Sequence, residues 1–487
     1  MKHNILYGIL LWIASLMTAA CSEWINVRPK NRIEAEEMLS KGIGYETALN
    51  GIYQEISEKS VYGQELSWGF LSVISQDYAS PSGNPEYKDA RHYRFESIYL
   101  SPLINDIWSK MSNALANTNF LLDNIASADT NIFELKSLEK NLIQGEALAL
   151  RAMINFELLR LFAPAPILRE PKAVLPYINT FPSLYELPVS TDKFLNLAID
   201  DLKKAKNLLA TCDTLERYSK WIGSISARLE GYSDYSGRGK FFSYRSTRLN
   251  YIATTCLLAR VYQYAGMEEK AYAEAKEVID IGYRFTPSHE LNPYDPERAD
   301  RKMHHDIMFA LFNNKMPKIL ASYYEEKLNS PLIIQNPEDV FGEDKNDYRK
   351  IYLTTALENN KPICIRWKTS SDEGTARVQK PLIPIIRLSE MYYIAAETIF
   401  DKDPVKAVDY LNTVRRGRGN RTALPVPSSK DELVNHIIND ARREYMTEGQ
   451  AFFLYKRTNK EIVGAPVKSE IRYVLPIPSS NDVSPNN

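Results

Sequence analysis

The residues with the clearest chemical potential are tyrosines that lie outside any helical pattern. The chain contains 30 Tyr against 6 Trp, and most of these tyrosines are expected to pack between helices. Aromatic residues stand beside Asp, Asn, Arg and Gly without an apolar period in three stretches, Val61–Tyr99, Cys212–Arg245 and Phe285–Thr375. Aromatic faces stack on the C–H faces of sugar rings while neighbouring polar groups bond the hydroxyls, a combination that suits glycan capture. The predicted ligand-binding residues are Asp77, Tyr78, Tyr87, Arg91, Tyr93, Tyr323 and Tyr324, with Tyr232, Tyr235 and the stretch Trp221–Tyr244 as the next candidates.

Residues that could support catalysis or bind a metal do not form a recognisable pattern. His304-His305-Asp306 are adjacent, so their side chains point to different faces, and no third ligand stands at helical spacing. The chain has no G-x-S-x-G elbow and no P-loop. The carboxylate pairs Glu36-Glu37 and Glu325-Glu326 are more typical of a solvated helix face than of a glycosidase cleft. We therefore predict no catalytic residue, no metal site and no cofactor.

The elements that must position these stretches are helical hairpins. In Leu382–Arg416, the residues Ile385, Leu388, Tyr392, Ala395 and Ile399 line one face of a predicted first helix. Asp403 is the expected N-cap of a second helix, with Pro404 at its first position. A second copy occurs 136 residues earlier (394 − 258), in which Leu258, Ala259, Ala271, Ala275 and Val278 match Ile394, Ala395, Ala407, Leu411 and Val414. Small residues where paired helices cross are typical of tetratricopeptide-type hairpins.

Four further segments show strong helical periodicity, namely Pro102–Ile125, Leu138–Phe162, Thr191–Leu209 and Asp431–Met446. Short strand-like pieces occur at Ile307–Phe312 and Ile363–Trp367. The predicted fold is thus mostly α, with about four tetratricopeptide-like hairpins as a scaffold, long irregular insertions forming a second lobe, and few short strands. Arg387, Glu390, Glu397, Arg442, Arg443 and Glu444 stand among apolar stripes, which favours structural ion pairs over a reaction centre.

The amino terminus predicts an exported and lipid-anchored protein. Lys2 precedes an apolar run from Ile5 to Met17 that is too short to span a membrane, and small residues lead to Cys21. We predict a signal peptide over residues 1–20 and lipidation of Cys21. Residues 21–487 are expected to form one domain, with parts at about 21–250 and about 251–487. The formal net charge of −1 gives no general attraction to nucleic acid.

Several short motifs, taken in order, resemble the SusD/RagB family of outer-membrane lipoproteins. These motifs are the lipoprotein start, Ala48–Tyr53 (ALNGIY), Glu146–Ala152 (EALALRA), Leu257–Tyr262 (LLARVY), Ile386–Glu397, Arg442–Glu444, Glu448–Gln450 and Leu475–Pro478 (LPIP). The chain departs from the family at Ala163-Pro164-Ala165, at Leu454 and at Asn481-Asp482. These departures affect scaffold segments, so they bear on the subfamily and leave the fold expectation intact.

The resemblance implies a cell-surface lipoprotein of the outer membrane that captures an oligosaccharide and delivers it to a SusC-like TonB-dependent transporter. No ligand residue transfers by motif, because the aromatic loops are the variable parts of the family. Three alternatives stay open from the sequence: a RagB-type peptide-binding lipoprotein, a helical-repeat assembly scaffold without a small ligand, and a hydrolase.

Overall fold

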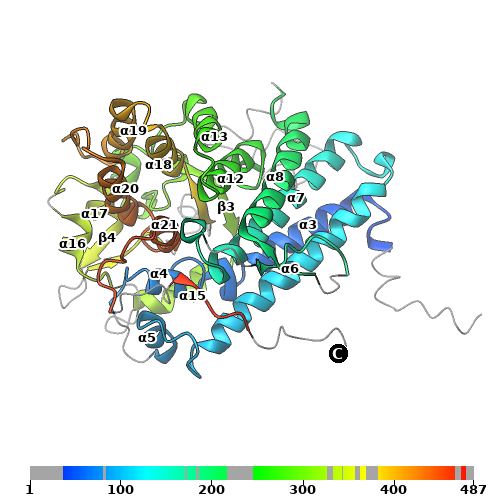
Figure 1. The fold of residues 1–487 in the computed structure, drawn as a ribbon, viewed down its shortest axis with the longest axis horizontal. Helices are drawn as coiled ribbons and strands as arrows, with labels where there is room; N and C mark the ends of the chain where they lie inside the picture. Colours follow the sequence, from blue (N-terminus) through cyan, green and yellow to red (C-terminus); the bar gives the residue numbers. More distant parts are fainter. Residues whose placement is uncertain are drawn as a thin grey trace, which may run out of the picture.

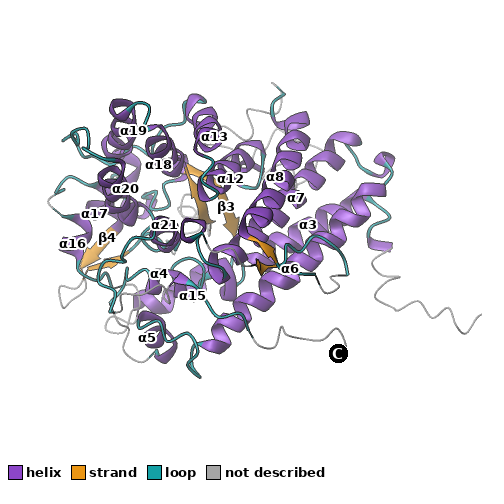
Figure 2. Ribbon diagram, in the orientation of Figure 1, coloured by secondary structure: helices purple, strands orange, loops and turns teal. Residues whose placement is uncertain are grey.

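The computed structural model describes residues 37–79, 84–169, 173–182, 186–215, 245–325, 333–342, 344–356, 362–368, 382–466 and 473–478. Within them, long helices dominate and strands are few and short (Figure 2). The mostly helical fold class predicted from the sequence is confirmed. Cys21 and the stretch Trp221–Tyr244 lie outside the described residues.

The long helices form a row in which each contacts the next. The row contains α3 (Gly42–Ile56), α6 (Ser101–Ser127), α7 (Ser137–Phe162), α8 (Thr191–Asp213), α12 (Tyr251–Tyr264), α13 (Glu268–Asp280), α18 (Leu388–Ile399), α19 (Pro404–Gly417) and α20 (Lys430–Glu444). Figure 1 shows this row running from α3 and α6 on one side to α19 and α20 on the other. The predicted helices at 102–125, 138–162, 191–209 and 431–446 correspond to α6, α7, α8 and α20.

Smaller elements lie alongside the row. The helices are α4 (Phe70–Ile74), α5 (Pro85–Arg91), α14 (Ser288–Leu291), α15 (Met316–Glu325), α16 (Pro337–Phe341), α17 (Tyr348–Leu353) and α21 (Gln450–Thr458), with a π-helical turn at Lys59–Gly63. The strands pair as β1 (Ala173–Leu175) with β2 (Val189–Ser190), β3 (Ile307–Phe312) with β6 (Leu382–Arg387), and β4 (Thr354–Ala356) with β5 (Pro362–Cys364), each antiparallel.

The two matching hairpins are α12–α13 and α18–α19, which pack against each other through α13 and α18. Asp403 caps α19 as predicted, because its side chain accepts a hydrogen bond from the Lys406 N–H at 2.9 Å. Gly266, between α12 and α13, has φ +71°, a conformation that favours glycine. Ala259 and Ala395 are both 0% exposed, as their shared register predicts. The tetratricopeptide likeness of the hairpins stays a prediction.

Enlarging these alanines should destabilise the scaffold. Because Ala259 and Ala395 have no free surface, replacing either by Leu is expected to lower the free energy of unfolding by about 1–3 kcal/mol through overpacking. The measurement is urea denaturation followed by circular dichroism. Ala126→Leu on the exposed face of α6 is the control and should leave the midpoint unchanged. Unchanged midpoints for both buried variants would contradict close helix crossings at these positions.

One boundary of the predicted hairpin is wrong. Residues 382–387 were expected to begin the first helix, but they form strand β6, and α18 starts at Leu388. All six residues of β6 are buried, and they pair with β3, where Ala310 lies opposite Pro384. An apolar run buried on both faces looks the same in a strand and in a helix, and Pro384 disfavours the helix because it lacks an N–H donor.

The composition of Val61–Tyr99 predicts a long structured loop, but part of this stretch is helical. It contains α4, α5 and the end of the π-helical turn, and Trp68, Phe70 and Ile74 within it are 0% exposed. Its aromatic residues lack a helical period because they pack in several directions around short helices. Many of its described apolar residues therefore belong to the core.

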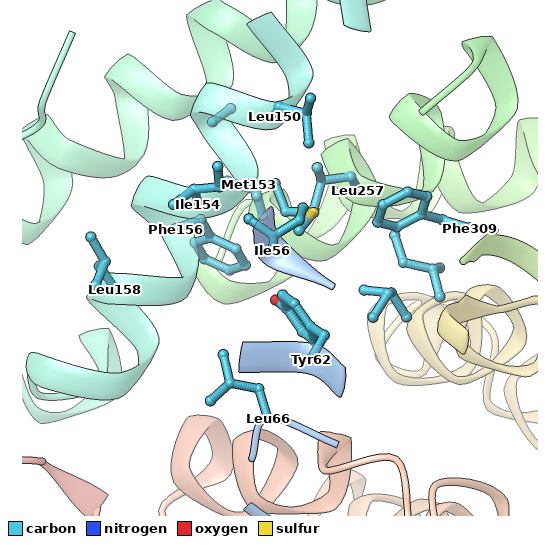
Figure 3. Packing of buried hydrophobic residues seen from close by; sticks show 14 of the residues in the cluster. Ile56, Tyr62, Leu66, Leu150, Met153, Ile154, Phe156, Leu158, Leu257 and Phe309 are labelled. Carbon is cyan, nitrogen blue, oxygen red and sulfur yellow. The ribbon is translucent and has the colours of Figure 1, made fainter. Parts of the chain in front are cut away.

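A continuous apolar core connects the early and late parts of the chain. One cluster of buried residues runs from Leu39 to Leu475. In Figure 3, Tyr62 and Leu66 lie beside Phe156 of α7, with Leu257 of α12 and Phe309 of β3 nearby. Among the described helices, none combines the length and apolar character needed to cross a membrane.

Candidate ligand-binding site

Three of the predicted ligand-binding tyrosines have their rings covered by protein. Tyr78, Tyr87 and Tyr93 are 1%, 2% and 6% exposed. The Tyr87 hydroxyl donates to Glu65 Oε2 at 3.0 Å, and the Tyr93 hydroxyl donates to the Ile74 carbonyl at 2.9 Å. The expectation that these rings stand free on a loop is wrong, because α4 and α5 turn them into the core. Ligand contact by them stays a prediction that would require the rings to be uncovered.

The structure nevertheless joins the segment of Asp77 and Tyr78 to residues 333–335, which follow Tyr323 and Tyr324 in the sequence. Tyr78 forms an antiparallel bridge with Ile334, the Ala79 N–H donates to the Ile333 carbonyl at 2.8 Å, and the Gln335 N–H donates to the Asp77 carbonyl at 3.1 Å. Ile333 in turn bridges to Ile363 in β5, which pairs with β4. We call this assembly of residues 77–79, 333–335, 362–364 and 354–356 the junction sheet.

Tyr323 and Tyr324 lie near the carboxyl end of α15, whose last residue is Glu325. Their side chains lie outside the described part of the chain. Along the sequence, residues 326–332 lie between the end of α15 and the junction sheet. Residues 80–83 and 357–361 also adjoin the junction sheet in sequence and lie outside the described residues.

Two titratable groups lie in or beside the junction sheet, Asp77 within it and Arg91 next to it. Burial raises the pKa of the Asp77 carboxyl to about 7, although hydrogen bonds from Ser75 and Ser72 oppose this shift. Arg91 is half-buried, its Nη1 donates to the Tyr78 carbonyl, and burial lowers the pKa of its guanidinium. Among the described residues, no carboxylate lies within ion-pairing distance of Arg91. Its remaining N–H groups can therefore bond a polar ligand.

A second feature was not predicted. An open hollow of about 630 Å³ lies between residues Tyr93–Ser97 and Val474–Pro476. The carboxyl-terminal segment is held there by the Leu475 N–H, which donates to the Leu161 carbonyl at 3.0 Å. Ile98 and Tyr99 follow the hollow directly and are 80% and 53% exposed. Tyr99 is thus an exposed aromatic residue at the end of the stretch singled out by composition, and nothing in the sequence distinguished it from the buried tyrosines.

The histidine cluster is divided among separate partners. His304 Nδ1 lies 2.6 Å from Asp300 Oδ1, His305 Nε2 lies 3.0 Å from Glu290 Oε2, and Asp306 pairs with Arg418. Among the described residues, no group of three or more His, Cys, Asp or Glu side chains could hold a metal ion.

The chain is similar to known proteins in both sequence and structure. Residues 261–478 match the SusD family model. The matched region is 218 of the 487 residues, so the carboxyl-terminal part of the chain is similar to the SusD/RagB family. A SusD-like protein P25 from Formosa agariphila is 25% identical over 218 residues, which is 42% of this chain and 39% of that relative, so the match spans well under half the length of the relative.

Solved SusD structures share the fold over nearly the whole chain. A SusD-like carbohydrate binding protein from Bacteroides vulgatus has a TM-score of 0.68 at 16% identity, covering 91% of this chain and 96% of that chain. A SusD superfamily protein from Bacteroides thetaiotaomicron has a TM-score of 0.62 at 21% identity, covering 89% and 92%. One from Parabacteroides distasonis has a TM-score of 0.65 at 17% identity, covering 93% and 97%.

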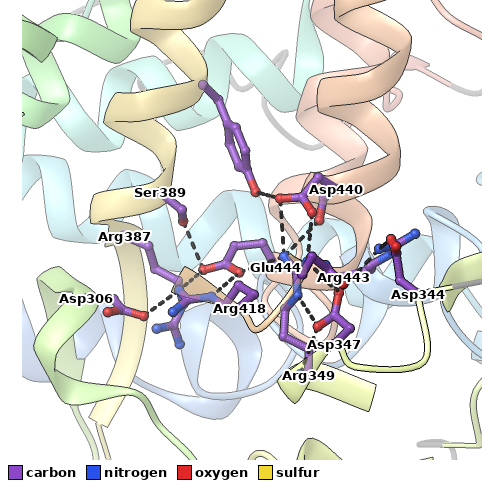
Figure 4. A network of polar contacts seen from close by, with 12 residues as sticks. Asp306, Asp344, Asp347, Arg349, Arg387, Ser389, Arg418, Asp440, Arg443 and Glu444 are labelled. Carbon is purple, nitrogen blue, oxygen red and sulfur yellow. Dashed lines mark hydrogen bonds and ion pairs between the residues drawn. The ribbon is translucent and has the colours of Figure 1, made fainter. Parts of the chain in front are cut away.

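The SusD-matching segment contains a buried network of charges beside the junction sheet. Glu444, which is 0% exposed, accepts from Ser389 Oγ at 3.0 Å, Arg349 Nη1 at 3.0 Å and Arg418 Nε at 3.0 Å (Figure 4). Burial alone would raise the pKa of Glu444, but Arg418 and Arg349 hold it well below its usual range.

The charged residues named from the sequence all have structural partners. Their ion pairs are Arg387 with Glu448, Arg260 with Glu390, Arg457 with Glu397, Arg442 with Asp339, Arg443 with Asp344, and Arg418 with Glu444. The interpretation of these residues as structural ion pairs is confirmed.

Proposed function

We propose that this protein captures an oligosaccharide at the cell surface and delivers it to a SusC-like TonB-dependent transporter in the outer membrane. The proposal is supported by the match of residues 261–478 to the SusD family model and by a fold shared with a SusD-like carbohydrate binding protein from Bacteroides vulgatus. The single observation that carries it on this chain is the junction sheet, which joins residues 77–79, at the centre of the aromatic stretch Val61–Tyr99, to residues 333–335.

In this proposal the ligand lies along the outer edge of the junction sheet. Arg91 supplies hydrogen bonds to hydroxyl groups, and Tyr323 and Tyr324 supply aromatic faces for stacking. Asp77 and Tyr78 are part of the sheet, and their buried side chains, like those of Tyr87 and Tyr93, support the residues that contact the ligand. A rigid support reduces the entropy lost on binding, because the contacting residues are already positioned.

The test is calorimetry with the mature chain against bacterial, plant and host glycans and a matched panel of peptides. We expect glycan binding in the wild type, and Tyr323→Ala should weaken it by about 1 kcal/mol or more, roughly a fivefold rise in Kd. Tyr294→Ala removes a fully exposed tyrosine outside the junction sheet and is the matched control, expected to bind as the wild type does.

The other outcomes separate the alternative functions. Binding of peptides without glycans would support a RagB-type peptide carrier. No binding to either panel would favour an assembly scaffold, and shortened oligosaccharides after a day with the wild type would indicate a hydrolase. Undiminished affinity in the Tyr323→Ala variant would place the site elsewhere, with the hollow beside Tyr99 as the next region to test.

The predicted lipidation of Cys21 can be tested separately. If Cys21 is lipidated, Cys21→Ala should release a folded, soluble protein that no longer incorporates a labelled fatty acid. Metabolic labelling followed by membrane fractionation measures both effects. Equal label in wild type and variant would contradict lipidation at Cys21. An anchored chain remains near its transporter, where its local concentration is high.

A further inference from the structure

A small polar cavity lies between helices from both ends of the chain. Its volume is about 50 Å³, and it is bounded by α7, α12, α18, α20 and α21. The polar side chains that line it include Arg160, Arg260, Tyr264, Glu390, Glu397 and Gln450. The cavity therefore lies where α7 meets the helices of the SusD-matching segment.

The charges that line the cavity neutralise one another. Arg260 Nη2 bonds Glu390 Oε2 at 2.6 Å, and Arg457 bonds both oxygens of Glu397 at 2.7 and 2.6 Å. Arg160 pairs with the neighbouring Glu157. Because carboxylates and guanidiniums are present in matched pairs, neither a free anion nor a free cation would meet a complementary lining.

Two buried donors that line the cavity lack protein partners among the described residues. Gln450 Oε1 accepts from Arg160 Nη1 at 3.3 Å, which fixes the amide orientation and leaves Nε2 without an acceptor. The Tyr264 hydroxyl likewise has no partner. The two side chains are 6% and 4% exposed, so bulk solvent does not satisfy them. Burial raises the pKa of Tyr264, so its hydroxyl remains a donor at neutral pH.

We propose that ordered water molecules occupy this cavity and accept hydrogen bonds from Gln450 Nε2 and Tyr264 Oη. One water needs about 10–15 Å³ of such space, so the cavity has room for more than one. Water is both donor and acceptor, which suits a lining that combines free donors with paired carboxylates. The bound water joins α12 to α21, and through the bond between Gln450 and Arg160 it extends the contact to α7.

The first test is a high-resolution crystal structure of the mature wild-type chain. We expect electron density for water within hydrogen-bonding distance of Gln450 Nε2 and Tyr264 Oη. An empty cavity, or density with the height and contacts of an ion, would overturn the proposal. Oxygen-17 relaxation dispersion in solution should also detect at least one long-lived water that is lost or exchanges faster in Tyr264→Phe.

The second test asks whether Tm falls or rises when the Tyr264 hydroxyl is removed. Tyr264→Phe removes only the hydroxyl. If the hydroxyl bonds a water, its loss should lower Tm by about 1–2 °C, whereas removing an unsatisfied hydroxyl from a dry cavity should raise Tm. Tyr177→Phe is the reference, because the Tyr177 hydroxyl donates directly to Asp201 Oδ2 at 2.7 Å and its loss must destabilise. A rise in Tm for Tyr264→Phe, with a fall for Tyr177→Phe, would refute the water site.

Discussion

Replacing Glu444 by Gln is expected to lower the free energy of unfolding by about 3–5 kcal/mol. The side chain is fully buried, and its two oxygens accept from Arg349, Arg418 and Ser389. The amide would present donor hydrogens to these donors and would leave two buried guanidiniums with less negative charge. Arg418 would then retain Asp306, and Arg349 would retain Asp347 and Asp440.

Urea denaturation at neutral pH, followed by circular dichroism, measures this loss. The matched control is Glu269→Gln, which breaks the exposed pair between Lys402 and Glu269 and should not shift the midpoint measurably. Similar midpoint shifts in the two variants would mean that the buried Glu444 contributes no more to the free energy of unfolding than the exposed Glu269 does.

The charge network also supports the candidate site. Glu448, 2% exposed, accepts from Arg387 Nε of β6 at 2.7 Å and from Arg366 Nη1 at 2.7 Å. Arg366 follows β5 of the junction sheet by two residues, and Trp367 next to it donates to Thr447 Oγ1 at 2.8 Å. The segment between α20 and α21 thus holds the residues that directly follow β5.

The helices were predictable because their apolar stripes are long and their caps are local. Asp403 and Pro404 identify the start of α19 within four residues of sequence, and the capping bond to Lys406 follows from the same stretch. The repeated register also predicts the burial of Ala259 and Ala395, which are both 0% exposed. Each of these inferences depends on residues within a few turns of one another.

The site was less predictable because its contacts join distant residues. Composition singled out Val61–Tyr99 and the region of Tyr323 as candidate ligand-binding segments, but it could not show that Tyr78, Tyr87 and Tyr93 face the core. The ionic partners were equally hidden, since Arg418 and Asp306 are 112 residues apart and Arg349 and Asp440 are 91 apart. Only the fold determines such pairs.

Stability should depend on pH through Asp77, which is part of the junction sheet. Burial raises the pKa of Asp77 from 3.8 to about 7, with Ser75 and Ser72 opposing the shift. Between these values the folded protein binds more protons than the unfolded chain. The contribution of Asp77 is therefore most favourable below pH 4 and is lost as the pH rises through 7. Between pH 5 and pH 8 we expect this group to reduce the free energy of unfolding by about 2–3 kcal/mol.

Asp77→Asn should remove that loss, because the amide stays neutral like the protonated acid. The variant should match the wild type below about pH 4, and its stability advantage should grow by about 2–3 kcal/mol between pH 5 and pH 8, as measured by urea midpoints. Glu65, whose pKa burial also raises to about 7, remains in both proteins and so cancels from the comparison. Asp106→Asn, at an exposed position on α6, is the control and should follow the wild-type profile. Parallel profiles for Asp77→Asn and the wild type would show that Asp77 ionises normally and that the junction sheet admits water to its carboxylate.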